Sequence, residues 1–459
     1  MMTVQQQYFG YYHGDGFPSG TPWHFAPLAE LGNSNVMLIN SRHEPDDLKR
    51  MLDWLAARRC RFIISVADCF FCGGQQSILA SGRRQEDWLQ RWMQCRELLQ
   101  PYEELLLGFY FDEPYWNGVR EDDFRDVTRM IRRQYPHKKV MACLTALELA
   151  PEAFGYPIAA AGSSYYEFIT DGAYDVYKKW DFFLYGYLHE KLKQLLPAGA
   201  AVWHIVWGFT NETKDSAPSA LIENLLHFYA MTKADPHCAG MLVFSYASGD
   251  AGDWGSGMDR MLDPEHRLYD AALRSLHVQV GKAVINGGSD DLFISSADFS
   301  SDKHAQRGWR YEELADAAAE RPEAQQRPLT YDSERNGWLN PASGTALHRY
   351  LAASGKHGEQ AVRSWTAPKA GEVIVVSGSG IRLVEAAGEE RAAIQIRHNS
   401  EKIWPLQSEW QEVGGGQEQC EHRLQVRVEQ GDRLSFIVSA LPGQYCGKLI
   451  WWDPVISFL

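Results

Sequence analysis

The chain of 459 residues lacks several features that would assign it directly to a class of protein. No apolar run approaches the length of a membrane span, so we expect no membrane partner. The net charge of -14 provides no basic excess, so we expect no nucleic-acid partner either. The N-terminal residues show no basic region followed by an apolar core. We therefore expect a cytoplasmic protein, an expectation that holds only if no leader has been trimmed.

Motifs for metals, cofactors and activated nucleophiles are also missing. The eight cysteines show no regular spacing, and the CxxC pair Cys69 and Cys72 has no second pair nearby. There is no His-x-His, HExxH or GxSxG motif, and His13 and His204 stand apart in the sequence. His204 lies inside a predicted strand, where a core histidine is expected. We therefore expect no metal and no cofactor, and the lack of a glycine-rich phosphate loop disfavours a phosphorylated substrate.

The first part of the chain alternates short apolar runs with amphipathic helical patterns. This alternation predicts an α/β fold, a (β/α)8 TIM barrel over residues 1–280. The expected strands are Tyr8–Tyr12, Asn35–Asn40, Phe62–Val66, Leu106–Phe111, Val140–Leu144, a weak one within Tyr165–Tyr177, Ala201–Trp207 and Gly240–Tyr246. The expected helices are Asp46–Arg58, Asp87–Leu99, Asp122–Arg133, Ala220–Lys233 and Pro264–Leu276.

Residues 281–459 show a different pattern, in which short alternating segments are separated by glycine-rich turns. This pattern predicts an antiparallel β-sandwich. Ala315–Arg327 is expected to be a short helix or a surface loop. The expected strands are Glu372–Ser377, Ala392–Arg397, Arg423–Glu429, Arg433–Val438 and Lys448–Trp452.

The fourth predicted strand ends in the most informative motif of the chain. Leu106–Phe111 is followed directly by Asp112 and Glu113, and then by Tyr115 and Trp116. The chemistry of a TIM barrel lies at the C-terminal ends of its strands. Carboxyl groups and aromatic rings at this place suit a site that stacks on sugars and moves protons.

The other strand ends add further carboxylates and aromatic residues. We expect the rings to form platforms for a sugar, although any single ring could equally be part of the rim packing. The candidate substrate-binding residues are Tyr12, His13, Asp68, Tyr115, Trp116, Asp171, Trp207, Glu212, Tyr246 and Trp254.

Glycoside hydrolysis requires one carboxyl group that protonates the leaving oxygen and a second that attacks the sugar or activates water. Glu113 fits the acid, because the neighbouring charge of Asp112 and the following rings would raise its pKa. Asp112 is the third catalytic candidate, as an orienting or charge-tuning group. The alternative is structural, with Asp112 capping a helix and Glu113 in a loop ion pair.

The second carboxylate has several candidates. Asp175, which lies between two aromatic residues in Tyr-Asp-Val-Tyr, is favoured. Asp171, Glu212 and Asp68 compete with it, and each could instead be a loop cap or a surface acid.

The motif Gly-Phe-Tyr-Phe-Asp-Glu-Pro at the end of the fourth strand resembles the TIM-barrel glycoside hydrolase superfamily. The resemblance implies that Glu113 is the general acid/base. It also implies a nucleophile at the seventh strand, near which Glu212 lies. Asp112 stands where the largest clan has asparagine.

The second domain resembles the jelly-roll accessory modules of bacterial glycan enzymes, which bind carbohydrate or brace the barrel. The segments that carry this resemblance include Trp309-Arg-Tyr311 and Trp452-Asp-Pro454. Most of its tryptophans are expected in the core rather than on a binding surface; those considered are Trp309, Trp365, Trp404, Trp451 and Trp452.

The leading hypothesis is thus a glycosidase that acts on an oligo- or polysaccharide. The rival is a carbohydrate-binding protein on a barrel that has lost catalysis. A lyase or isomerase on the same barrel is a third option. The sequence predicts neither the sugar nor the oligomeric state.

Overall fold

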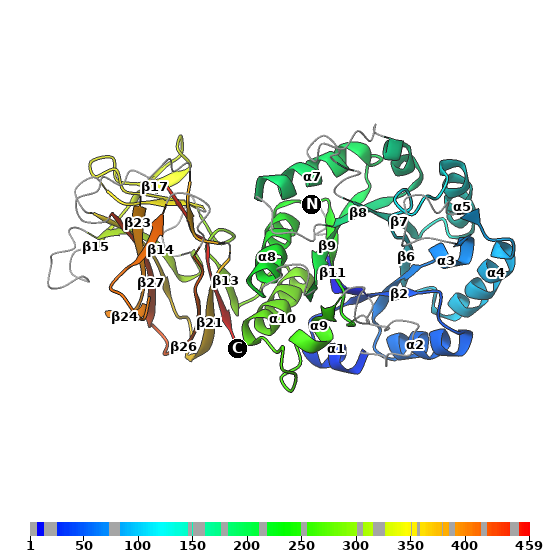
Figure 1. Cartoon of the computed structure of the whole chain (residues 1–459), viewed down its shortest axis with the longest axis horizontal. Coiled ribbons are helices and arrows are strands. Elements are labelled where there is room, and N and C mark those ends of the chain that lie inside the picture. The colour runs from blue at the N-terminus through cyan, green and yellow to red at the C-terminus, as the bar shows by residue number, and fades with distance from the viewer. Residues whose placement is uncertain are drawn as a thin grey trace. The chain divides into compact units, whose positions relative to one another are not determined.

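The computed structural model divides the chain into two compact units, Met1–Ser289 and Asp290–Leu459 (Figure 1). The expected division at about residue 280 falls inside helix α10, Ala271–Asn286, which completes the first unit. The structure describes residues 7–12, 25–72, 83–145, 149, 161–175, 182–210, 218–248, 255–300, 306–314, 326–349, 351–355, 359–378, 380–384, 391–414, 420–440 and 449–459.

The first unit contains a closed barrel in the strand order β1-β11-β9-β8-β7-β6-β3-β2. All neighbouring strands are parallel, and the ring closes where β1 pairs with both β2 and β11. This confirms the predicted TIM barrel, including the weak sixth strand. The barrel strands are β1 Tyr8–Tyr12, β2 Val36–Asn40, β3 Arg61–Ser65, β6 Leu106–Phe111, β7 Lys139–Leu144, β8 Asp171–Asp175, β9 Ala201–Trp207 and β11 Cys238–Phe244.

Helices surround the ring of strands (Figure 1). Their apolar faces pack inward; in α2, for example, Leu48, Met51, Leu52 and Leu55 are buried at helical spacing. Helices α1 and α7 were not predicted from the sequence. The main helices of the unit are α1 Phe25–Leu31, α2 Pro45–Ala57, α4 Trp88–Leu99, α5 Glu121–Gln134, α7 Phe182–Leu195, α8 Pro218–Ala234 and α10 Ala271–Asn286.

The last helix of the barrel unit begins later than predicted. The side chain of Asp270 accepts a hydrogen bond from the backbone N–H of Leu273 over 2.7 Å and caps α10 at its N-terminus. Gly287 ends the helix with a left-handed φ of 75°, which glycine adopts without steric cost. The prediction of Pro264–Leu276 was therefore wrong at both ends, because the cap and not the apolar pattern sets the start.

The second unit is an antiparallel β-sandwich, as predicted. Its strands form sheets in the orders β13-β29-β21-β26, β15-β14-β20-β27-β23-β24 with β25 on β23, and β16-β17-β18-β19-β28-β22. The strands are β13 Leu292–Ile294, β14 Trp309–Leu314, β15 Gln326–Pro328, β16 Thr330–Asp332, β17 Gly337–Leu339, β18 Ala346–His348, β19 Leu351–Ala353, β20 Gln360–Thr366, β21 Gly371–Ser377, β22 Arg382–Leu383, β23 Arg391–His398, β24 Glu401–Trp404, β25 Gln411–Gly414, β26 Arg423–Val428, β27 Arg433–Ala440, β28 Ile450–Trp451 and β29 Pro454–Phe458.

The core of the sandwich holds most of the tryptophans that had been weighed as sugar platforms. Trp309, Trp365 and Trp452 are buried in one apolar cluster. Trp451 is also buried, and Trp404 is half-buried against the same cluster. The prediction that most of these rings are core residues is confirmed. The segment 315–325 of the predicted helix or loop lies outside the described residues.

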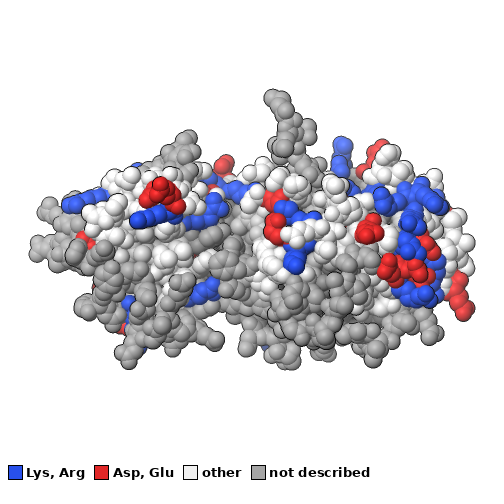
Figure 2. All heavy atoms as spheres, turned by 90° about the horizontal axis from the view of Figure 1, so that it is seen from above, with Lys and Arg blue, Asp and Glu red and all other residues white. Residues whose placement is uncertain are grey.

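The surface of the barrel unit carries charges of both signs. In Figure 2, basic and acidic side chains lie next to one another over the described part of this unit. One ion pair of opposite charges in this unit joins Arg91 of α4 to Asp87, 2.9 Å apart, at the start of that helix. No helix within the described ranges is both long and apolar enough to cross a membrane.

Candidate active site

The side chains of β6 alternate between the barrel interior and the surrounding helices. Phe111 packs against Phe124 of α5 with ring centroids 5.2 Å apart, on the outside of the barrel. Tyr110 contacts the ring of Tyr12 at 5.7 Å. The strands β6 and β1 are not neighbours in the ring, so this contact crosses the interior. Asp112, two residues after Tyr110, continues the inward face.

Asp112 lies among hydrogen-bond donors and charges at the C-terminal end of β6. The Tyr110 hydroxyl donates to Asp112 Oδ1 over 2.9 Å, and the Tyr12 hydroxyl also bonds this carboxyl group. Burial raises the pKa of Asp112, and the negative charge of Asp68 adds to the increase. The two phenols and the Arg42 guanidinium oppose the shift without cancelling it. A carboxyl group with a raised pKa at a barrel mouth is suited to general acid catalysis.

Asp68 and Arg42 lie just after β3 and β2, the two barrel strands that come directly before β6 in the sequence. Asp68 lies on the short helix α3, Ala67–Phe70, directly after β3, and Arg42 follows β2. Removal of water by its surroundings raises the pKa of Asp68, whereas Arg42 and Arg91 pull it down. The side chain of Asp68 is nonetheless exposed, so its charge is partly screened by solvent. Neighbouring strand ends thus bring together Asp112, Asp68 and Arg42.

Glu113 has a backbone conformation that is uncommon for residues other than glycine. Its φ is 41°, in the left-handed region. The turn that follows is held by hydrogen bonds from the backbone N–H of Asn117 to Glu113 O and from Asn117 Nδ2 to Asp112 O, each 2.9 Å long. Glu113 therefore breaks the alternation of the strand. Without this turn, it would follow Phe111 to the outside of the barrel.

Two aromatic residues follow within this turn, and both are half-buried. The ring of Tyr115 packs edge-on against Tyr165 with centroids 5.9 Å apart. The Tyr165 hydroxyl in turn donates a hydrogen bond to the carbonyl of Val119. Tyr115 is thereby tied to the loop that carries it, and Trp116 keeps part of its side chain exposed next to Glu113.

Three other predicted platforms are buried in this structure. Tyr12, Trp207 and Tyr246 are each 3% exposed, which leaves no open ring face for stacking. Tyr12 packs against Phe244 with centroids 5.0 Å apart, and Tyr246 packs against Tyr11 at 5.2 Å. For these residues, the alternative of rim packing describes the structure better.

Tyr246 also lines a cavity of about 590 Å³ beside the barrel wall. Its other lining residues come from α1, from the short helix α9, Met258–Met261, from the segment 262–266 and from the first turns of α10. They include Glu30, Asp259, Arg260 and Arg274.

The expectation for Asp171 is corrected by the structure. Asp171 is the first residue of β8, so it lies at the N-terminal end of the barrel, opposite to the candidate site. There it is buried, accepts a hydrogen bond from Lys139 Nζ at 2.8 Å and another from Trp203 Nε1 at 3.2 Å. The strand begins where the sequence analysis had placed a strand end, and Asp171 has a structural role.

The remaining candidates fall on parts of the chain that the structure does not describe. His13, Glu212 and Trp254 lie outside the described residues. Asp175 is the last residue of β8, at the C-terminal end of the barrel, but the structure does not describe its side chain.

The sequence analysis missed Tyr110 as a member of the site and did not select Arg42. The sequence did contain a signal for Tyr110, because residues two apart on a strand share a face and Tyr110 is two residues before Asp112. For Arg42, the only signal in the sequence was its position after the second strand. In the described chain, the groupings of side chains able to hold a metal ion lie elsewhere, around His189 on α7.

No family model and no curated protein matches the chain. Among solved structures, similar chains include a β-glucuronidase from Bacteroides uniformis, with 8% identity, a TM-score of 0.42, and coverage of 99% of this chain and 66% of that one. A glucosidase from Croceicoccus marinus shows 9% identity, a TM-score of 0.39 and coverage of 96% and 97%. Xylanase 10B from Thermotoga maritima shows 10% identity, a TM-score of 0.43 and coverage of 62% and 97%. The chain spans less than two thirds of the length of the glucuronidase, and the TIM-barrel fold itself is established by the strand order above.

Proposed function

We propose that the protein is a glycoside hydrolase that cleaves an oligo- or polysaccharide by carboxylate acid/base catalysis. The observation that carries the proposal is the pair of carboxyl groups with raised pKa, Asp112 and Asp68, at the ends of neighbouring barrel strands. Glycosidic cleavage needs an acid that is still protonated near neutral pH. Apolar surroundings and a second negative charge are the two ways to obtain one.

Within this site, we assign proton transfer to Glu113. The carboxyl group of Asp112 is held by two phenols of the barrel interior, which suits a fixed, charge-tuning group. Glu113 follows directly, and its left-handed φ of 41° turns the chain away from the strand direction. Non-glycine residues in this region concentrate at functional sites, where the surrounding structure maintains the strain. Asp175 stays the proposed second carboxylate, because its strand ends at the same face of the barrel.

The test is hydrolysis of a glycan panel, measured as released reducing ends, by the full chain and by Glu113→Gln. Loss of a general acid lowers the rate by about 10²–10⁴-fold. We expect this loss in Glu113→Gln with sugar binding retained. The matched control is Glu97→Gln, which changes an exposed acid on α4 and is expected to leave the rate unchanged. Full activity in Glu113→Gln would remove this residue from the mechanism.

The second candidate function is carbohydrate binding without hydrolysis. It is favoured by the place of Asp171, which removes one candidate for the second catalytic carboxylate. Calorimetric titration with the same glycans separates the two functions. Binding without any released reducing end over long incubation would support the binding protein and reject the hydrolase.

A further inference from the structure

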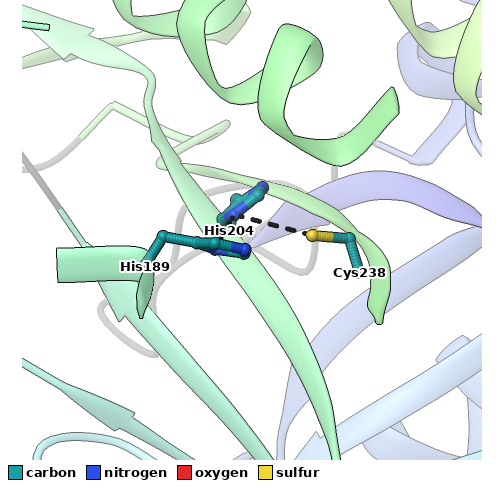
Figure 3. Close-up of side chains that lie close together, drawn as sticks. All are labelled: His189, His204 and Cys238. Carbon is teal, nitrogen blue, oxygen red and sulfur yellow. Dashed lines mark hydrogen bonds between the residues drawn. The ribbon is translucent and has the colours of Figure 1, made fainter. Parts of the chain in front are cut away.

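A second group of chemically active side chains lies in the wall of the barrel, away from the candidate active site. His189 on α7, His204 on β9 and Cys238 at the start of β11 point their donor atoms toward one another (Figure 3). All three residues are buried. They are distant in sequence: the pairing of β9 with β11 and the packing of α7 against β9 bring them together. We propose that they form a metal site, and that the metal is monovalent copper.

The separations between the donor atoms suit one shared ion. His204 Nε2 lies 3.2 Å from His189 Nδ1 and 3.9 Å from Cys238 Sγ. Metal–nitrogen bonds of about 2.0 Å and metal–sulfur bonds of about 2.3 Å place such donors about 3.3–3.8 Å apart. The third pair, His189 Nδ1 and Cys238 Sγ, lies within 4.8 Å, so movements of the side chains could bring all three donors onto one ion.

Neighbouring groups hold both imidazoles in orientations that suit a ligand. His189 Nε2 lies 2.9 Å from Asp235 Oδ2. Asp235 Oδ2 also forms an ion pair with Lys193 Nζ, at 2.7 Å. An ionised carboxylate only accepts, so His189 donates from Nε2 and directs the lone pair of Nδ1 into the group. This is the usual carboxylate–histidine arrangement behind a metal ligand.

The other ring nitrogen of His204 also has a hydrogen-bond partner. Its Nδ1 lies 2.7 Å from the hydroxyl of Thr232 on α8, which can donate or accept. The ring of His204 is fully buried, and its Nε2 lies 3.2 Å from His189 Nδ1. Without metal, Thr232 donates to Nδ1 and Nε2–H of His204 donates to His189. With metal, the proton moves to Nδ1 and is donated to Thr232, and Nε2 binds the ion.

Charge and ligand type select the metal. The ammonium of Lys193 is shared between two carboxylates, at 2.7 Å from Asp235 Oδ2 and 3.2 Å from Glu190 Oε1. The three ligands themselves carry one negative charge, the thiolate of Cys238. A monovalent ion and these ligands are therefore neutral as a group, whereas Zn²⁺ with the same ligands carries one positive charge. Thiolate and imidazole ligands also suit Cu(I), and three donors satisfy its low coordination number.

Binding forms a copper–sulfur bond to Cys238 and breaks the S–H bond of the thiol. The thiol proton goes to solvent, while His204 only exchanges one tautomer for the other.

The experiment is an anaerobic competition between the full chain and a chromophoric Cu(I) chelator. We expect the protein to withdraw one equivalent of copper from the chelator. Cys238→Ser should weaken binding by about a hundredfold or more, because the single thiolate is lost. The matched control is Cys72→Ser, which removes an exposed cysteine outside the group and should bind as the parent does.

Folding of each variant is checked by circular dichroism. X-ray absorption of the copper-loaded parent provides a readout that needs no variant, with two nitrogen ligands and one sulfur ligand expected. The proposal would be overturned if the parent failed to take copper from the chelator or if Cys238→Ser bound copper as tightly as the parent. A copper ion without a sulfur ligand in the loaded parent would overturn it as well. Displacement of Cu(I) by equimolar Zn²⁺ would overturn the choice of metal.

Discussion

The hydroxyl of Tyr110, on the inner face of β6, donates a hydrogen bond over 2.9 Å to Oδ1 of Asp112, the residue that follows the end of this strand. This bond lowers a pKa that burial raises, so Tyr110 sets how far Asp112 departs from an ordinary carboxyl group. Tyr110 thus tunes Asp112, the carboxyl group that we propose tunes Glu113 in turn.

Tyr110→Phe removes this donor and should raise the pKa of Asp112 further. A hydrogen bond to a charged group contributes about 1.5–3 kcal/mol, so its loss should give a measurable rise. Carbon-13 NMR of the aspartate carboxyls across a pH titration measures the shift. Tyr331→Phe, which removes a hydroxyl from the second unit, is the control. A fall in the pKa of Asp112 in Tyr110→Phe would contradict the assigned role.

Glu113→Gly should stabilise the protein by about 1 kcal/mol. The left-handed φ of 41° costs free energy with a side chain but not in glycine. Part of the gain is offset by the greater freedom of glycine in the unfolded chain. Urea unfolding measures the change. The same variant should lose hydrolysis, so stability and activity move in opposite directions; a clear loss of stability would show that the conformation is unstrained.

Asp453 should make the stability of the second unit depend on pH. Burial raises its pKa to about 6 from 3.8, although the backbone N–H and the hydroxyl of Ser296 donate to its oxygens at 2.9 and 2.6 Å. The folded state therefore holds the proton more tightly than the unfolded state does. The stability it contributes is complete below pH 4 and is lost as the pH rises to 6, by about 3 kcal/mol at most.

Urea unfolding of the full chain between pH 4 and 7, followed by tryptophan fluorescence, measures this loss. Asp453→Asn has no charge to gain and should flatten the slope. Asp332→Asn, a change at the surface of the same unit, should keep it. An unchanged slope in Asp453→Asn would assign the pH dependence to other groups.

Gly10→Ala should destabilise the barrel by about 2–3 kcal/mol. A Cβ at this position of β1 would lie 1.9 Å from the carbonyl oxygen of Val36 on β2, so the paired backbones would have to separate. Gly186→Ala is the contrasting variant, because α7 leaves open space there and alanine favours a helix by up to about 1 kcal/mol. Thermal unfolding should move in opposite directions for the two changes. A neutral Gly10→Ala would mean that β1 and β2 can move apart at little cost.

Much of the fold was predictable because each element carries its own local signal. The strand Leu106–Phe111 was predicted with its bounds, since an apolar run ends there in charged residues. The start of α10 was not predicted correctly, because it depends on the side-chain cap of Asp270 rather than on the periodicity of apolar residues. The sixth strand was located only roughly, and this error placed Asp171 at the wrong end of the barrel.

The sequence by itself determined the barrel, the sandwich and the acidic motif at the end of the fourth strand, because hydrophobic period and strand ends are local properties of the chain. Only the tertiary structure decided which side chains meet. Asp112 and Asp68 approach because β3 and β6 pair, and His189, His204 and Cys238 converge because α7 packs on the barrel wall. Such contacts depend on the distances between elements, and no spacing along the chain encodes them.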